Sequence, residues 1–249
     1  MKLDTLNEEQ KEAVEYLNGP LLVLAGAGSG KTKVLTTRIA NLIDKGISPY
    51  NILAITFTNK AAAEMKSRVV KLVGGEANSM QISTFHSFGL RLIRENNSLL
   101  GLDNNFAIFD VEDSITAIKR VLKRLNIDSN KYTPKSFHNK ISSLKNDLIN
   151  SNSYSKYARD EFENMVVKVY DEYEKEKLND NAVDFDDLLL LPIKLFKEHK
   201  DILEKYQERF KYILIDEYQD TNEAQYIMTK LLASRYQNIC VVGDSDQAI

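Results

Sequence analysis

The sequence predicts an α/β protein whose parallel sheet is covered by helices on both faces and interrupted by an all-helical segment. Short apolar runs alternate with amphipathic helical stretches over residues 1–109, strand patterns are then absent until Lys211, and they return afterwards. Such alternation is typical of a parallel sheet buried on both faces. We therefore expect a sheet domain in two pieces, 1–109 and 209–249, with an inserted helical subdomain at 110–208.

Residues 21–32 predict a phosphate-binding loop (P-loop) between a buried strand and a helix. An apolar run of four residues is followed by glycines at 26, 28 and 30, and Lys31 and Thr32 then open a helical stretch. Glycine lets the backbone turn tightly, so that loop N–H groups and the helix N-terminus converge on an anion. We expect Lys31 to reach the β- and γ-phosphates and the Thr32 hydroxyl to hold Mg²⁺. Ala25 stands where the strict motif has glycine, and the alternative is a glycine-rich turn that binds nothing.

A short amphipathic helix is expected at residues 5–18, ahead of this loop. Thr5 or Asn7 can cap it, and Gly19-Pro20 ends it. The amide of Gln10 offers the donor and the acceptor that suit the edge of adenine. An exposed helix glutamine is the alternative interpretation.

Two further strands are expected at 52–57 and 80–83, each followed by a helix. After each strand the chain pairs hydroxyl groups with an aromatic ring. Hydroxyls and helix N-terminal amides suit phosphates, and rings suit unstacked bases. The residues concerned are Thr56, Phe57, Thr58, Asn59, Thr84, Phe85, His86 and Ser87. Spacing alone favours the alternative that Phe57, Phe85 and Phe88 belong to the core.

Beyond Phe109 the apolar residues recur with helical spacing. Helices are expected at 110–126, 134–150, 156–178 and 184–208. Residues 119–159 carry ten lysines and arginines against two aspartates, a local balance of +8. Such a patch can neutralise phosphates, and solvated helix faces are the alternative. Asp186 and Asp187 are adjacent, so on a helix they point in different directions, and we do not expect them to form a metal pair.

An apolar strand at 212–215 leads directly into Asp216 and Glu217. Together with the upstream loop, this acidic pair predicts the second half of a nucleotide site. Asp216 would hold Mg²⁺ through water, and Glu217 would orient and deprotonate the attacking water. The last expected strand, 239–242, leads to Gln247, which would report on the γ-phosphate.

The overall composition is that of an ordinary globular protein. The 249 residues are 43% hydrophobic and 28% charged, and no apolar run is long enough to span a membrane. Cys240 is the one cysteine, which excludes a disulfide framework and predicts a reducing, cytoplasmic compartment. Because it lies in an apolar run, we expect a small buried hydrophobe rather than a nucleophile. The net charge of −3 does not by itself indicate nucleic acid.

Taken together, the motifs resemble the UvrD/Rep/PcrA-type DNA helicases of superfamily one. Seven segments carry the resemblance in family order: Leu6-Asn7 with Gln10 and Ala13-Val14, Ala25–Thr32, Ile55–Ala62, Thr84–Ser87, Asp184–Leu188, Ile215–Asn222 and Val242–Gln247. The resemblance implies a RecA-like P-loop NTPase fold that uses ATP and Mg²⁺.

The resemblance also implies roles for individual residues. The nucleotide would be bound by Gln10, Ala25, Gly26, Ala27, Gly28, Ser29, Gly30, Lys31, Thr32 and Lys33. The metal would be held by Thr32 and Asp216, and hydrolysis would depend on Lys31, Glu217 and Gln247. Single-stranded DNA would contact Thr56, Phe57, Asn59, Thr84, Phe85, His86 and Ser87.

The implied protein is an ATP-driven 3′-to-5′ translocase that unwinds DNA at a duplex junction, needs no membrane, and works with repair or replication proteins. Two features depart from the family. Lys33 replaces the usual arginine and lacks the planar group that stacks on adenine, so a weaker base contact is expected. The family also has a second RecA-like domain, and this chain stops within the motif at Gln247, so we expect an amino-terminal piece that binds ATP without unwinding DNA.

Three alternatives remain at this point. The chain is the motor portion of a helicase–nuclease, a nucleotide-gated DNA-binding module, or a small-molecule kinase that uses the same loop. The sequence Asp-Glu-Tyr-Gln-Asp at 216–220 and the long helical insertion argue against the kinase.

Overall fold

The computed structural model describes residues 5–26 and 28–244, which form two compact units. The first unit contains the chain up to Phe88, 196–221, and the residues from Tyr226 onward; the second contains Gly89–Leu195 and Asn222–Gln225. The units therefore divide at Phe88 and Leu195, within helices, and not at the expected 109 and 208.

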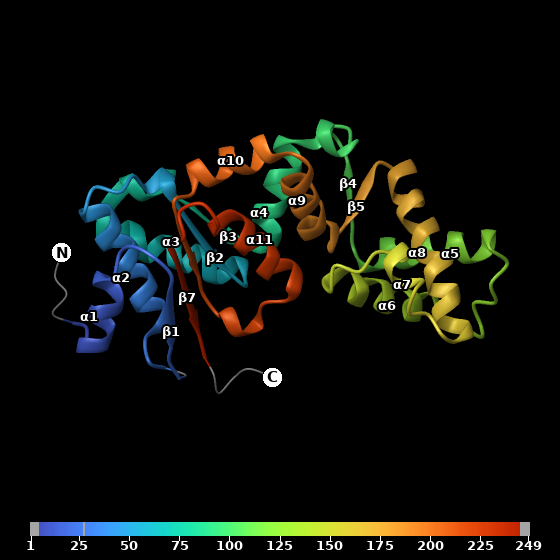
Figure 1. Ribbon diagram of the computed structural model, residues 1–249, viewed down its shortest axis with the longest axis horizontal. Coiled ribbons are helices and arrows are strands. Elements are labelled where there is room, and N and C mark those ends of the chain that lie inside the picture. Colours follow the sequence, from blue (N-terminus) through green and yellow to red (C-terminus); the bar gives the residue numbers. More distant parts are fainter. Residues whose placement is uncertain (1–4, 27, 245–249) are drawn as a thin grey trace. The chain divides into compact units, whose positions relative to one another are not determined.

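The first unit is built on a five-stranded parallel sheet with the order β1-β7-β6-β2-β3 (Figure 1). The strands are β1 (Leu21–Leu24), β2 (Ile52–Thr56), β3 (Gln81–Thr84), β6 (Tyr212–Ile215) and β7 (Ile239–Gly243). Each strand begins and ends within one residue of its predicted position. Because all strands run parallel, their carboxyl ends meet at one edge, where parallel sheets place their ligands.

Both faces of the central strands are covered. Ile52 and Ala54 of β2 belong to a core shared with α2 (Lys31–Asp44) and α3 (Asn59–Val73). Leu53 and Ile55 point to the opposite face and are equally buried.

The edge strand β1 is different. Leu22 and Leu24 are 58% and 62% exposed, so the prediction of a fully buried strand is wrong for this part of the chain. Leu21 and Val23 point to the opposite face and pack against the core, so β1 is buried on one face only.

Further helices belong wholly or partly to the first unit, and the last of them was not predicted from the sequence. They are α1 (Glu8–Glu15), α4 (Phe85–Glu95), α10 (Lys200–Arg209) and α11 (Glu223–Ala233). Short 3₁₀ turns lie at Pro49–Asn51, Gly74–Ser79, Asn97–Leu100 and Tyr218–Asp220. The first helix is shorter than the predicted 5–18, and Asn7 caps it through reciprocal hydrogen bonds with Gln10.

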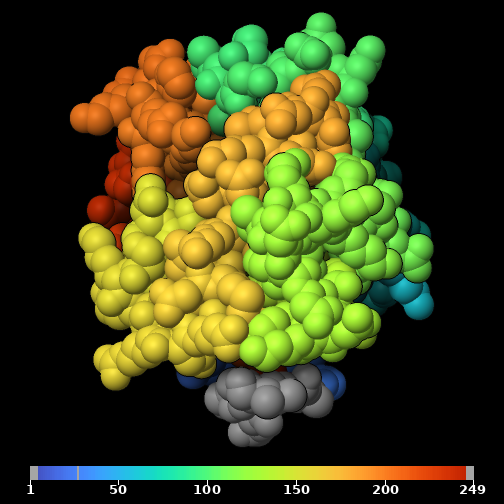
Figure 2. Space-filling view, turned by 90° about the vertical axis from the view of Figure 1, so that its right-hand side faces the viewer, coloured from blue at the N-terminus to red at the C-terminus, as the bar shows by residue number. Residues whose placement is uncertain are grey.

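The second unit is mainly helical. Its helices are α5 (Val111–Arg124), α6 (Pro134–Asn146), α7 (Ser151–Tyr154), α8 (Glu161–Asn179) and α9 (Asp187–Glu198). Helix α5 packs against α6 and α8 around a core that includes Val121, Phe137 and Val169. Figure 2 shows one face of this unit, where earlier segments in yellow-green lie beside later segments in yellow and orange.

The prediction of an all-helical insertion is wrong in one respect. The strands β4 (Ala107–Phe109) and β5 (Ala182–Asp184) pair in parallel. Three-residue strands are too short to show a period, so helical spacing on either side obscured them. The predicted helix at 184–208 is also two helices, because α9 ends at Glu198 and α10 begins at Lys200.

No helix in the part of the chain that the structure describes is both long and apolar enough to cross a bilayer.

Candidate nucleotide-binding site

The loop after β1 has the backbone that a phosphate cradle requires. Gly28 and Gly30 have φ angles of +75° and +86°, which residues with a Cβ rarely adopt. Ala25 is not among the residues with positive φ, so its methyl group is tolerated where the strict motif has glycine. Ala27 lies outside the described residues.

Lys31 and Thr32 open helix α2 and join the loop to the neighbouring strand ends. Lys31 Nζ donates to the Ala25 carbonyl at 3.1 Å and to Asp244 Oδ2 at 2.9 Å. Thr32 Oγ1 donates to Asp216 Oδ2 at 3.2 Å. The loop and the acidic strand end, 184 residues apart in sequence, are therefore in direct contact.

Asp216 and Glu217 follow strand β6 directly and lie beside this loop. Burial raises the pKa of Asp216, the charge of Glu217 raises it further, and the hydrogen bond from Thr32 opposes both effects. The Thr32 hydroxyl and the Asp216 carboxylate are oxygen donors of the kind that Mg²⁺ prefers, so this pair fits the ion.

Glu217 has a left-handed backbone, with φ +51° and ψ +45°. For a residue with a side chain this conformation costs about 1–3 kcal/mol and persists only where the surroundings impose it. Such outliers concentrate at functional sites. Its side chain is half-buried, and the residue lines a cleft.

Gln10 contacts the loop, whereas Lys33 contacts the segment before the first helix. Gln10 Nε2 donates to the Ser29 carbonyl at 2.9 Å, so the residue is tied to the loop and is not merely an exposed helix glutamine. Lys33 Nζ donates to the Thr5 carbonyl at 2.6 Å. Their roles in binding the base stay predictions.

One cleft joins the nucleotide residues to the first group of predicted DNA contacts. Thr32, Asp216 and Glu217 line it together with Thr56, Phe57, Thr58 and residues Ala61, Glu64 and Arg68 of α3. A ligand in this cleft would touch both groups.

The predicted DNA residues form a hydrogen-bonded set across the ends of β2 and β3. Ser87 Oγ donates to Asn59 Oδ1 at 3.2 Å, and Thr84 Oγ1 donates to Ser87 Oγ at 3.0 Å. Thr56 is buried, and its hydroxyl donates to the Thr58 carbonyl at 3.1 Å. This arrangement links the two loops with each other, whatever they bind.

The aromatic residues of these loops divide by burial. Phe85 and Phe88 are 2% and 1% exposed, so both belong to the core as spacing alone suggested. Phe57 is half-buried and meets Phe85 edge-on, with ring centroids 6.2 Å apart. His86 is half-buried, and burial lowers its pKa, which favours the neutral imidazole. Contact of these residues with DNA stays a prediction, and Gln247 lies outside the described residues.

Two polar residues of this site were not assigned a role from the sequence. Asp244 follows β7 and holds Lys31, and Gln219 lies on the turn after Glu217 and bonds to its carboxylate at 2.9 Å. The position of Gln219 two residues after Glu217 was the signal that could have indicated its role. Its second partner, Asp244, could not be predicted, because that contact depends on the order of the strands.

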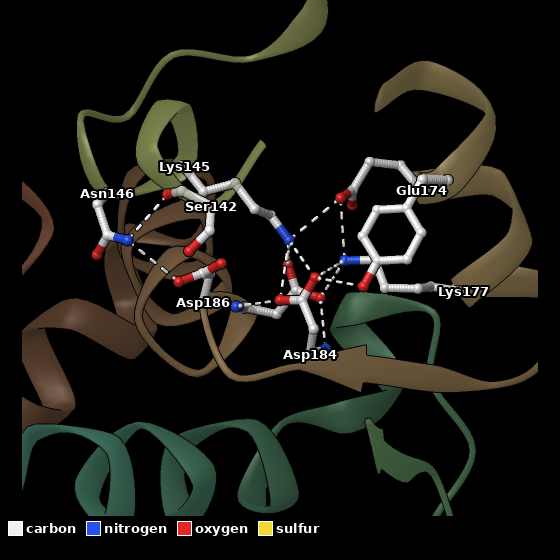
Figure 3. A network of polar contacts seen from close by, with 9 residues as sticks. Ser142, Lys145, Asn146, Glu174, Lys177, Asp184 and Asp186 are labelled. Carbon is white, nitrogen blue, oxygen red and sulfur yellow. Dashed lines mark hydrogen bonds and ion pairs between the residues drawn. The ribbon is translucent and has the colours of Figure 1, made fainter. Parts of the chain in front are cut away.

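The segment Asp184–Leu188 contributes to a buried ion cluster in the second unit (Figure 3). Lys145 Nζ lies 2.7 Å from Asp184 Oδ2 and 2.7 Å from Asp187 Oδ1, and Lys177 Nζ pairs with the same two carboxylates. Glu174 lies within 3.1 Å of both ammonium groups. Oxygens of the three acids lie within 4.8 Å of one another, as in a metal site, but the lysines supply the positive charge there.

Asp186 faces away from this cluster and accepts a hydrogen bond from Asn146 Nδ2 at 3.2 Å. The two adjacent aspartates therefore point toward different partners, as predicted for neighbouring positions. Burial raises the pKa of Asp186.

The basic segment 119–159 is less available to phosphates than its charge suggested. Lys145 is buried in the ion cluster, and Arg120 and Arg124 both pair with Glu176. Lys131 pairs with Glu161. At least these four charges are neutralised within the unit, so the count of +8 overstates the free positive charge.

Comparison with known proteins decides the family. Residues 6–249 match the model of the UvrD/REP helicase N-terminal domain. The chain belongs to the UvrD/REP helicase N-terminal domain family. It is 53% identical over 248 residues to the ATP-dependent DNA helicase PcrA of Staphylococcus aureus (strain Mu50), which covers 99% of this chain and 34% of the relative. It is also 53% identical over 245 residues to the PcrA helicase of Staphylococcus epidermidis (strain RP62A), with 98% and 34% coverage.

The UvrD/REP domain identified here thus spans about a third of the length of these curated relatives. Its RecA-like α/β sheet and helical insertion are those expected of this family.

Proposed function

We propose that this chain is the ATP-binding part of a DNA helicase motor that hydrolyses ATP and translocates along single-stranded DNA in the 3′-to-5′ direction. The observation that carries the proposal is the hydrogen bond of 3.2 Å between Thr32 and Asp216, beside the loop that contains Lys31. This contact supports the proposal because it joins the glycine-rich loop to a carboxylate at the end of a neighbouring strand.

In this proposal each residue has a defined task. Lys31 and the loop N–H groups bind the terminal phosphates, and Thr32 and Asp216 hold Mg²⁺, which neutralises charge on the phosphates when bound. Glu217 orients the attacking water and accepts its proton. Gln10 recognises the adenine edge, and Gln247 contacts the γ-phosphate.

The proposed DNA path follows the ends of β2 and β3. The hydroxyls and amide of Thr56, Asn59, Thr84 and Ser87 would contact phosphates, and the half-buried Phe57 would offer its ring to a base. The cleft shared with Asp216 and Glu217 supports coupling between this path and the nucleotide.

The relatives named above are about three times as long, and we propose that a second RecA-like domain completes the motor in the cytoplasm. An arginine supplied by such a domain is worth about 10³–10⁵ in rate. The chain alone is therefore expected to bind Mg²⁺-ATP, hydrolyse it slowly, and fail to unwind DNA. Repair or replication proteins are the proposed partners.

Calorimetry with Mg²⁺-ATP at concentrations up to millimolar tests the proposal. The wild-type chain should bind, Lys31→Ala should show no detectable binding with an unchanged circular dichroism spectrum, and Lys45→Ala, an exposed lysine at the end of the same helix, should bind as wild type does. Absence of binding by the wild type, or equal affinity in Lys31→Ala, would contradict the proposal. Rapid DNA-stimulated turnover by this chain would contradict the need for a second domain.

A further inference from the structure

A chain of hydrogen bonds joins Glu217 to the residue that holds Lys31. Gln219 Nε2 donates to Glu217 Oε2 at 2.9 Å, and Gln219 Oε1 accepts from the Asp244 backbone N–H at 2.9 Å. The Asp244 carboxylate in turn accepts from Lys31 Nζ at 2.9 Å. One amide side chain therefore donates to the Glu217 carboxylate and accepts from the backbone directly after strand β7.

The backbone around this amide is arranged to admit it. A Cβ added at Gly243 would lie 3.1 Å from Gln219 Oε1, a contact tighter than most real Cβ atoms make. The absence of a side chain at Gly243 thus leaves room for the amide. Gln219 itself lies on the one-turn 3₁₀ segment Tyr218–Asp220, which begins directly after the left-handed Glu217.

Glu217 needs such a support. Its strained backbone is stable only if neighbouring contacts impose it, and its side chain is half-buried and long enough to take several rotamers. Among the contacts that the structure describes, the Gln219 amide is the one that reaches its Oε2. Backbone hydrogen bonds from Asp220 N to the Glu217 carbonyl and from Thr221 N to the Tyr218 carbonyl fix the turn but leave the carboxylate unaligned.

We propose that Gln219 is a positioning residue that holds the Glu217 carboxylate in register with the Lys31 site through the backbone of Asp244. This inference rests on the proposed function, hydrolysis of ATP with Glu217 as the general base. Gln219 does not touch the reacting atoms and acts through Glu217. Because misplacing a catalytic group by about 1 Å can cost about 10²-fold, loss of the amide should slow hydrolysis by roughly 10- to 100-fold.

The test measures single-turnover phosphate release and Mg²⁺-ATP affinity of this chain in parallel. Gln219→Leu, which keeps the size but removes both hydrogen bonds, should lose about 10- to 100-fold in rate and change affinity less than about twofold. Gly243→Ala, which crowds the amide from outside, should lower the same rate to a smaller extent. Gln237→Glu, a change at an exposed glutamine on the same unit, should leave both quantities unchanged.

A double variant separates positioning from general structural damage. In a Glu217→Gln background, Gln219→Leu should cause no further loss of rate, because the group it positions is already inactive. An additional loss in that background, or a wild-type rate in Gln219→Leu, would overturn the inference while leaving hydrolysis by Glu217 intact. If phosphate release by the wild type equals that of Lys31→Ala, the proposed function fails, and the inference fails with it.

Discussion

Replacing Lys145 by methionine tests how much the buried ion cluster stabilises the second unit. The Lys145 side chain is 1% exposed, and its ammonium lies 2.7 Å from both Asp184 and Asp187. Methionine fills a similar volume without charge. Of the described residues, Lys177 would then be the one cation that still pairs with the two buried carboxylates. Removing one partner of a buried pair costs about 3–5 kcal/mol because the remaining charge stays desolvated. Since Lys177 still contacts both acids, we expect a loss near the lower limit, about 3 kcal/mol.

The measurement is urea unfolding followed by circular dichroism, with the free energy of unfolding extrapolated to water. Lys131→Met is the matched control, because Lys131 pairs with Glu161 at the surface, where the two side chains are 58% and 69% exposed. Exposed pairs contribute little, so the control should unfold close to wild type. Equal midpoints for Lys145→Met and Lys131→Met would refute the structural role of the cluster.

The same cluster predicts a pH dependence with a definite sign. Burial opposes ionisation of Asp184, but Lys145 and Lys177 outweigh it and hold its pKa well below the usual range. Its contribution is therefore present above the unfolded pKa of about 3.9 and is lost as the pH falls toward the folded pKa. Burial raises the pKa of Asp187, which reduces this loss in acid.

At alkaline pH the stability of the cluster depends on the charge of Lys145. Burial lowers its pKa, but the surrounding carboxylates outweigh burial and raise the pKa well above its usual value. The contribution of Lys145 is complete below the unfolded pKa of about 10.4 and is lost as the pH rises through the folded pKa. The difference in unfolding free energy between wild type and Lys145→Met should thus be constant between roughly pH 5 and 9. A difference that changes steadily across this range would contradict the assignment of charges.

Two further predictions concern close contacts of the backbone and the loop. A Cβ at Gly89 would lie 1.8 Å from the Leu188 carbonyl oxygen, whereas one at Gly75 meets nothing closer than 3.9 Å. Gly89→Ala should therefore destabilise the chain by about 1–3 kcal/mol in thermal or urea unfolding and Gly75→Ala should not, and equal stability of the two variants would contradict the described contact. Gln10→Ala removes the hydrogen bond of 2.9 Å to the Ser29 carbonyl and the proposed adenine contact. It should reduce the preference for ATP over GTP in calorimetry, and an unchanged preference would exclude Gln10 from base recognition.

The sheet and its ligand edge were predictable because their signals are local. Four of the five strands of the first unit are mainly apolar runs of four or five residues, so their positions follow from composition. The exception is β3, Gln-Ile-Ser-Thr, which is mostly polar. The P-loop and the Asp216-Glu217 pair follow directly after such apolar strands, and parallel topology then brings them to one edge. Cys240 was likewise predicted to be inert, and it is 1% exposed with its pKa raised by burial to about 11.

What the sequence could not predict depends on contacts between distant segments. Lys145 was counted as part of a basic surface because a lysine carries no sign of its burial. Its partner Asp184 is 39 residues away, on a strand of three residues that has no detectable period. The exposure of Leu22 and Leu24 has the same origin, since it depends on whether a distant segment covers that face of β1.

The strand order also explains why the two halves of the nucleotide site are linked as they are. Strand β7 lies between β1 and β6, so the residue that follows β7 must face both the P-loop and the acidic strand end. Asp244 occupies this position, with its carboxylate on Lys31 and its N–H on Gln219. Lys31 and Glu217 are thus connected indirectly, through Asp244 and Gln219. Asp244 is 213 residues from Lys31 in the sequence. A change in the partner of Lys31 therefore has a direct hydrogen-bonded route to the carboxylate proposed to activate water, and that route passes through Gln219.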